Sequence, residues 1–162
     1  MQYDVSVKEV QPQVVLARHV VVDQVDLGTT IGSTMGEAYG FLAAAGIQPA
    51  GPPFVTYHKW ESGRWEADIC APASYSLPDA PPGFAWETID GGLAATTLHR
   101  GAYAGLAAAY GAIGDWAKDH GFTFAGAPRE IYMSEPGTPE DEIETIVEWP
   151  VVHAGVPAPV GA

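Results

Sequence analysis

The stretch GIQPAGPPFVTY, residues 46–57, returns in altered form as GFTFAGAPREIY, residues 121–132. Five of the twelve aligned positions are identical, and the same offset of 75 residues relates Gly36 to Gly111. In each copy a glycine follows a helical pattern, and a proline then leads into a short strand that ends in tyrosine. A fixed offset with a shared order of elements indicates an internal repeat. The chain is therefore predicted to contain two diverged copies of one unit.

Outward from this stretch, alternating apolar residues and turn residues divide each copy into a β-α-β-β order. The elements expected in the first copy are strands at 3–10 and 14–22, a helix at 28–46, and a hairpin of strands at 53–60 and 64–71. Those expected in the second copy are strands at 84–89 and 93–99, a helix at 103–120, and strands at 129–134 and 142–152. The predicted fold class is α+β, with two pseudo-symmetric units in one domain.

The predicted domain covers residues 1–152. The first repeat is expected at 1–72, a proline-rich linker at 73–83, and the second repeat at 84–152. A tail rich in Gly, Ala and Pro, residues 153–162, is expected to be flexible.

The first predicted helix has a regular glycine pattern. Thr29, Thr30 and Ser33 are candidates for capping its start, and Gly46 for ending it. Glycines recur every four residues, which predicts one helix face packed closely on a sheet; they are Gly28, Gly32, Gly36 and Gly40.

Composition excludes several classes of protein. The net charge is −13, from 20 acidic and 7 basic residues, so direct nucleic-acid binding is not expected. The acidic balance favours cationic small molecules or a basic protein partner, or serves only solubility. Cys70 is the single cysteine, which excludes an internal disulfide. With no signal peptide and no apolar run long enough to cross a bilayer, a cytoplasmic location is predicted, with no membrane contact.

No nucleotide-binding or catalytic motif is present, and no cofactor is predicted. None of the five histidines has the spacing of a metal site on one element. Asp68 and His58, on neighbouring predicted strands, are the only candidate pair, and no metal site is predicted from them.

Glu130 is the carboxylate that stands out. It lies in a short strand, 129–132, where alternation places Glu130 and Tyr132 on one face and Arg129 on the other. A carboxylate in a central strand needs a partner or a polar cavity, because an unpaired buried charge is costly. A salt bridge to a Lys or Arg is the competing interpretation. Glu148, on the last strand, is the second candidate.

Aromatic residues are abundant, with five Trp, seven Tyr and five Phe. Several lie on elements expected to meet where the two halves join: Tyr103, Tyr132, Trp86 and Trp149, with Tyr57 as the aligned counterpart of Tyr132. Aromatic rings beside a carboxylate hold flat cations by stacking and cation–π attraction. The alternative is that these rings only fill the core.

Taken together, the residues resemble the GyrI-like small-molecule-binding domains of the gyrase-inhibitor protein and of multidrug-sensing transcription regulators. The motifs that carry the resemblance, over residues 1–152, are Tyr3-Asp4-Val5, His99-Arg100-Gly101-Ala102-Tyr103, Trp116 followed by Gly121, Glu130-Ile131-Tyr132-Met133-Ser134-Glu135-Pro136 and Glu148-Trp149-Pro150-Val151. The resemblance implies an antiparallel sheet with two helices on one side and a ligand cleft at the junction of the halves.

The resemblance also implies a function. The chain would bind hydrophobic, cationic small molecules as a stand-alone sensor or sequestering protein, with Glu130 as the acidic anchor and Tyr132, Tyr103 and Trp149 lining the cleft. Two alternatives stay open. Some stand-alone members hydrolyse cyclopropane-bearing alkylating natural products, and Glu130 would then be the general base. The gyrase-inhibitor namesake instead implies an inhibitor that binds a protein partner through its acidic surface. The non-enzymatic interpretation is preferred.

Overall fold

A computed structural model describes residues 2–155 and divides them into two compact units. Unit 2 is the continuous segment Pro12–Ile89, and unit 1 combines the residues up to Gln11 with those from Asp90 onward. The predicted flexible tail lies outside the described residues from position 156 on.

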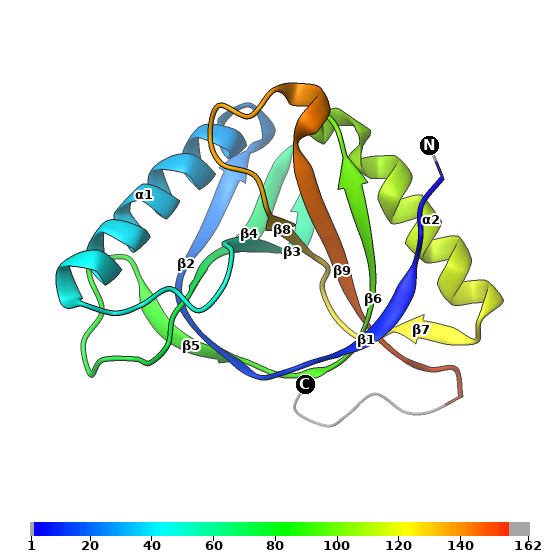
Figure 1. Ribbon diagram of the computed structural model, residues 1–162, viewed down its shortest axis with the longest axis horizontal. Helices are drawn as coiled ribbons and strands as arrows, with labels where there is room; N and C mark the ends of the chain where they lie inside the picture. The colour runs from blue at the N-terminus through cyan, green and yellow to red at the C-terminus, as the bar shows by residue number, and fades with distance from the viewer. Residues whose placement is uncertain (1, 156–162) are drawn as a thin grey trace. The chain divides into compact units, whose positions relative to one another are not determined.

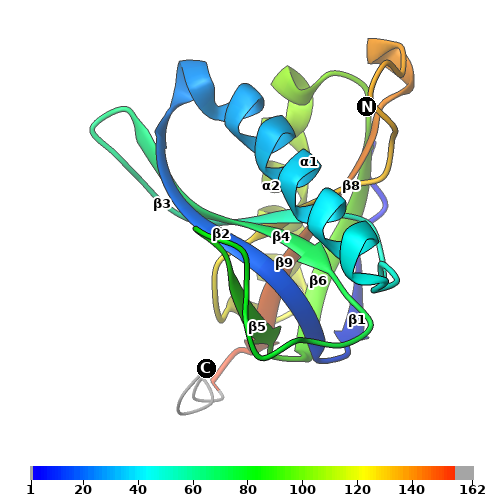
Figure 2. The same cartoon turned by 90° about the vertical axis from the view of Figure 1, so that its left-hand side faces the viewer.

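Unit 2 is an antiparallel sheet with strand order β3-β4-β2-β5, and helix α1 packs on one face over β2 and β4 (Figures 1 and 2). Its elements are β2 (Gln13–Asp23), a 3-10 turn η1 (Gln24–Asp26), α1 (Leu27–Ala45), β3 (Phe54–Glu61), β4 (Arg64–Pro72) and β5 (Ala85–Ile89). The predicted hairpin is confirmed. Ser62 and Gly63, between β3 and β4, have φ angles of 53° and 78°, which is the backbone twist of a tight hairpin turn.

Unit 1 repeats this plan, with strand order β1-β6-β9-β8, a short strand β7 that also pairs with β9, and helix α2 against the sheet. Its elements are β1 (Ser6–Val10), β6 (Gly92–Arg100), η2 (Tyr103–Gly105), α2 (Leu106–Asp119), β7 (Phe122–Phe124), β8 (Arg129–Tyr132), η3 (Glu140–Glu142) and β9 (Glu144–His153). The α+β class and the two β-α-β-β units, β2-α1-β3-β4 and β6-α2-β8-β9, are therefore confirmed.

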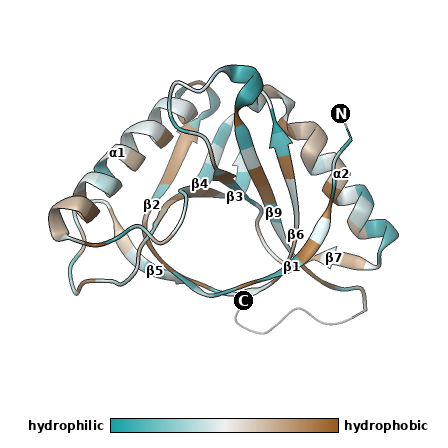
Figure 3. Cartoon of the chain, viewed as in Figure 1, coloured by the Kyte–Doolittle hydropathy of each residue, from teal (hydrophilic) through white to brown (hydrophobic). Residues whose placement is uncertain are grey.

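Each unit has its own apolar core between helix and sheet. The core of unit 2 contains Leu16, Ala38, Leu42, Ile47, Ala71 and Ala73. The core of unit 1 contains Ala95, Leu106, Ala109, Ile113, Val147 and Val151. The long strands β2 and β9 carry much of this hydrophobic character (Figure 3). Among the described helices, none has the length and apolar character needed to span a membrane.

The first strand of each sequence repeat pairs outside that repeat. Strand β1 pairs with β6 of unit 1, with Ser6 opposite Thr96, and β5 pairs with β2 of unit 2, with Leu16 opposite Trp86. The sequence repeats, 1–72 and 84–152, therefore differ from the compact units, and the 73–83 segment lies within unit 2. Strands β1 and β5 cover the edges that β6 and β2 would otherwise expose.

Helix α1 corrects two predictions. Gly46 does end it, with a φ of 72°. The glycines at 28, 32, 36 and 40, however, lie on the exposed face, and a Cβ atom at any of them would meet nothing within 4 Å. The buried face is formed by Thr34, Ala38 and Leu42. No capping hydroxyl serves the helix start either, because Asp26 is the N-cap residue and makes no side-chain cap hydrogen bond.

Candidate functional site

Glu130 lies on β8 and faces helix α2. It pairs with Val147 of β9, and Val147 is part of the core beneath α2, so the two side chains share that face of the sheet. The Tyr110 hydroxyl, from α2, donates a hydrogen bond of 2.7 Å to one carboxylate oxygen, and the Tyr132 hydroxyl donates one of 3.1 Å to the other. Within residues 2–155, no Lys or Arg forms an ion pair with Glu130. The carboxylate is held by neutral donors, and its charge is not balanced by a basic residue.

The surroundings of Glu130 change its acidity. Burial raises the pKa of the Glu130 carboxyl, because water no longer stabilises the charged form. Hydrogen bonds from Tyr110 and Tyr132 and the nearby His99 lower that pKa, but burial has the larger effect. The net effect is a carboxyl whose pKa lies above its ordinary value.

Aromatic rings extend from Glu130 in two directions. Tyr103 meets Tyr132 edge to face, with ring centroids 5.9 Å apart, and its side chain is about half exposed. Burial raises the pKa of the Tyr103 hydroxyl. The negative charge of Glu130 raises that pKa further, because it disfavours a second negative charge on the tyrosine oxygen. On the other side, Trp149 meets Tyr110 edge to face at 5.8 Å. Four of the predicted site residues, Glu130, Tyr132, Tyr103 and Trp149, thus belong to one connected group.

Trp149 is held firmly in this group. Its ring stacks on Phe124 at a centroid distance of 3.9 Å, and its indole N–H donates a hydrogen bond of 2.8 Å to the carbonyl of Gly126. These contacts fix the ring orientation, so Trp149 offers a rigid apolar surface beside Tyr110.

Glu148 is in a different environment. Because it pairs with Arg129 across the sheet, it lies on the face opposite to Glu130. It is 2% exposed and forms ion pairs with Lys8 at 2.9 Å and with Arg129 at 3.5 Å. Its charge is matched within the protein, and this carboxylate already has two basic partners.

Tyr57 and Trp86 belong to unit 2 and take part in its packing. Tyr57 is buried and meets Trp65 edge to face at 5.1 Å. Trp86 packs against Phe41 at 6.3 Å, and its indole N–H donates a hydrogen bond of 3.0 Å to the carbonyl of Asp79.

The sequence analysis missed Tyr110 and the role of His99. Tyr110 follows the buried position Ala109 on α2, and a polar aromatic at the margin of a buried helix stripe is the signal that would have found it. His99 is 4% exposed. Its Nε2 lies 2.9 Å from the carbonyl of Ala102, which can only accept, so Nε2 carries a hydrogen. Its Nδ1 lies 2.8 Å from the Tyr3 hydroxyl. Gly105 permits this arrangement, because a Cβ there would lie 3.0 Å from the His99 ring.

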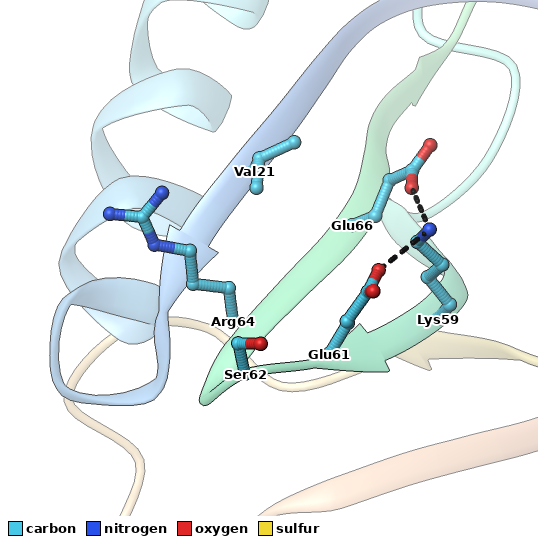
Figure 4. A pocket seen from close by; sticks show the side chains of 6 residues that line it. All are labelled: Val21, Lys59, Glu61, Ser62, Arg64 and Glu66. Atoms are coloured by element: carbon cyan, nitrogen blue, oxygen red, sulfur yellow. Dashed lines mark ion pairs between the residues drawn. The ribbon is translucent and has the colours of Figure 1, made fainter.

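A separate surface hollow lies at the β3–β4 hairpin of unit 2 (Figure 4). Four of its six lining residues are charged. The lining residues are Val21, Lys59, Glu61, Ser62, Arg64 and Glu66. Lys59 forms ion pairs with Glu61 at 2.8 Å and with Glu66 at 3.9 Å. None of these six lining residues is aromatic.

The fold agrees with the comparison to known families. The chain belongs to the GyrI-like small molecule binding domains, whose family model matches residues 3–152. No curated protein sequence matches the chain.

Several solved structures share the fold. The C-terminal domain of EcmrR superposes with a TM-score of 0.79 at 21% identity, covering 95% of this chain and 100% of that domain. EcmrR in its complex with DNA gives a TM-score of 0.82 at 20% identity and covers 94% of this chain, which spans only 58% of the EcmrR chain. SAV2435 bound to tetraphenylphosphonium gives 0.60 at 11% identity, covering 94% of both chains. At these identities the likeness establishes the fold.

Proposed function

We propose that this domain binds hydrophobic cations at Glu130, as a protein that senses or sequesters them. The observation that carries the proposal is the environment of this carboxylate: burial raises its pKa, and only the hydroxyls of Tyr110 and Tyr132 donate to it among the described residues. A cation with an apolar body would supply the missing charge while its body packs on Tyr103, Tyr132 and Trp149. The presence of tetraphenylphosphonium on the structural neighbour SAV2435 supports the choice of ligand class.

The test uses two ligands of nearly the same shape and opposite charge. Tetraphenylphosphonium is titrated into the full chain by calorimetry and by tryptophan fluorescence, and tetraphenylborate is titrated in parallel. We expect the phosphonium to saturate with a Kd on the order of micromolar and the borate to bind much more weakly.

Two variants connect binding to the carboxylate. Glu130→Gln keeps the shape and removes the charge, and it should weaken phosphonium binding by at least about tenfold, or about 1.4 kcal/mol. Glu135→Gln removes an exposed charge from the same unit and should leave affinity unchanged. Equal phosphonium affinity for wild type and Glu130→Gln would refute the anchoring role.

A hydrolase is the second candidate, and the raised pKa of Glu130 favours it, because a general base works best when its pKa approaches the working pH. In this role Glu130 would take a proton from water as the water oxygen attacks a cyclopropane carbon. One ring C–C bond would break, its electron pair would pass into the conjugated acceptor of the alkylator, and that acceptor would take up a proton, so that the product has gained one water. The test is incubation with a cyclopropane-bearing alkylator, followed by mass spectrometry for a product heavier by one water. The hydrolase proposal would be excluded if the wild type formed this product no faster than buffer alone, or no faster than Glu130→Gln. A protein partner for the acidic surface and a cytoplasmic location stay predictions.

A further inference from the structure

Two histidines from separate strands share one carboxylate on the sheet of unit 2. Asp68, on β4, lies directly opposite His19 of β2, and His58 comes from β3 on the other side. The Nδ1 atom of His19 lies 2.7 Å from one carboxylate oxygen of Asp68, and the Nε2 atom of His58 lies 2.7 Å from the other. One potential ligand atom from each residue can be chosen so that all three lie within 4.8 Å of one another.

The cluster lies on the sheet face away from α1. Leu16 and Ala71, a cross-strand pair in the core beneath α1, mark the helix-covered face, and alternation places His19 and Asp68 on the other one. The exposed fractions of the side chains are 53% for His19, 39% for His58 and 23% for Asp68. An ion in solution can therefore reach them without any rearrangement of the core.

His58 lies at a bulge in β3. The ladder between β3 and β4 is regular as far as Tyr57 opposite Ala67, and it resumes with Lys59 opposite Glu66, so His58 is the extra residue. Thr56 lies opposite Asp68, and alternation from Thr56 places His58 on the same face of the sheet as Asp68. Bulges occur often beside functional sites. Here the extra residue carries the second imidazole.

From this geometry we propose that His19, His58 and Asp68 bind one divalent transition-metal ion. Imidazole nitrogens and a carboxylate oxygen are the donors that Zn²⁺ and its neighbours in the series prefer, whereas Mg²⁺ and Ca²⁺ prefer oxygen alone. Ligands about 2.1 Å from a tetrahedral Zn²⁺ lie about 3.4 Å from each other, a spacing that small side-chain rotations reach from the observed positions. The ion would replace the shared hydrogens between the imidazoles and Asp68, with water completing its coordination.

A second carboxylate is placed to orient His19. The Nε2 atom of His19 lies 3.3 Å from Oε1 of Glu66, so a carboxylate stands beside the ring nitrogen that would not bind the proposed ion. Glu66 is in turn contacted by Lys59, as Figure 4 shows. Histidines that bind metals commonly donate their other N–H to such a carboxylate, which fixes the ring and its tautomer.

The experiment is calorimetric titration of the tag-free full chain with Zn²⁺, after removal of metals with a chelator. We expect a stoichiometry of one, and a loss of at least about tenfold in affinity for His58→Ala and for Asp68→Asn. Glu66→Gln should lose about tenfold or more while keeping that stoichiometry.

Two controls separate this site from casual surface binding. His120→Ala removes a histidine of unit 1, and Glu61→Gln removes a nearby exposed carboxylate outside the donor set; both should bind Zn²⁺ like the wild type. The visible spectrum of bound Co²⁺ reports nitrogen ligation and should change in His19→Ala. Far-UV circular dichroism shows that each variant is folded. Zn²⁺ binding that is equal in wild type, His58→Ala and Asp68→Asn, or absent from all three, would overturn the proposal.

Discussion

Replacing Tyr110 with Phe tests how Glu130 is held. The substitution keeps the ring, and with it the edge-to-face contact to Trp149, but deletes the hydroxyl that donates the 2.7 Å hydrogen bond to Glu130. Hydrogen bonds to a charged acceptor contribute about 1.5–3 kcal/mol. Tyr110→Phe should therefore raise the pKa of Glu130 further above its ordinary value, because the charged carboxylate loses a hydrogen-bond donor.

Loss of the same hydrogen bond should also lower the free energy of unfolding, by an amount that depends on pH. A carboxyl whose pKa is raised by folding contributes most at pH values below its ordinary pKa, and this contribution is lost as the pH rises through the folded-state pKa. Tyr110→Phe enlarges that rise in pKa. The variant should therefore be about 1.5–3 kcal/mol less stable than wild type near pH 7, with a smaller difference near pH 4.

The assay is a pH titration of the ¹³C carboxyl signal of Glu130, assigned with Glu130→Gln, together with urea unfolding at both pH values. Tyr132→Phe is the matched variant. Its bond to Glu130 is longer, at 3.1 Å, and its effect on the pKa should be smaller. A pKa of Glu130 that is unchanged or lower in Tyr110→Phe, or a stability loss equal at pH 4 and pH 7, would refute the reasoning.

Three further predictions concern stability, measured by urea or thermal unfolding. Gly36→Ala should stabilise the protein by about 0.5–1 kcal/mol, because a Cβ there enters open space on an exposed helix face; a loss would mean that the glycine face is covered. Tyr39→Phe should be neutral or stabilising, since the buried hydroxyl has no hydrogen-bond partner among the described residues and burial raises its pKa to about 12; a loss above about 1 kcal/mol would reveal a partner. Glu148→Gln should cost about 3 kcal/mol because it breaks the buried ion pair with Arg129, whereas Lys8→Met, at the exposed end of the same network, should cost less than about 1 kcal/mol; equal losses of stability in the two variants would contradict this prediction.

Local signals in the sequence were sufficient to predict most of the helices and strands. The first helix was expected at 28–46 and spans Leu27–Ala45, because a glycine with positive φ ends it and its apolar spacing is helical. The turn at Ser62 and Gly63 could also be predicted from the sequence. The pairing of distant strands could not be predicted, since no residue of 3–10 indicates that this strand pairs with β6.

The glycine face of α1 shows why spacing alone misleads. A repeat of four residues identifies a face of a helix, but it does not say which face meets the sheet. Thr34, Ala38 and Leu42 have the same spacing and form the buried face, although one of them is polar. Arg18 explains Thr34, because its guanidinium donates a hydrogen bond of 3.4 Å to the threonine hydroxyl.

The candidate sites show the same limit of local sequence signals. Glu130 is a candidate from the sequence because it is a carboxylate in a short strand expected to be central, and its role stays a prediction. Tyr110 could not be predicted, because its contact with Glu130 depends on how α2 packs on the sheet. In the histidine cluster, Asp68 and His58 form the candidate pair that the sequence offers. The contribution of His19 depends on strand register, which is not visible in the amino-acid order.

The exchange of first strands has a consequence for the order in which this chain can fold. Unit 2 is one uninterrupted stretch, Pro12–Ile89, between two segments of unit 1. Its pairs β2–β4, β2–β5 and β3–β4 join residues of that stretch, whereas β1 pairs with β6, beyond the whole of unit 2. Contacts between distant parts of a chain form more slowly than local ones. The edge of the unit 1 sheet is therefore expected to be completed after the sheet of unit 2.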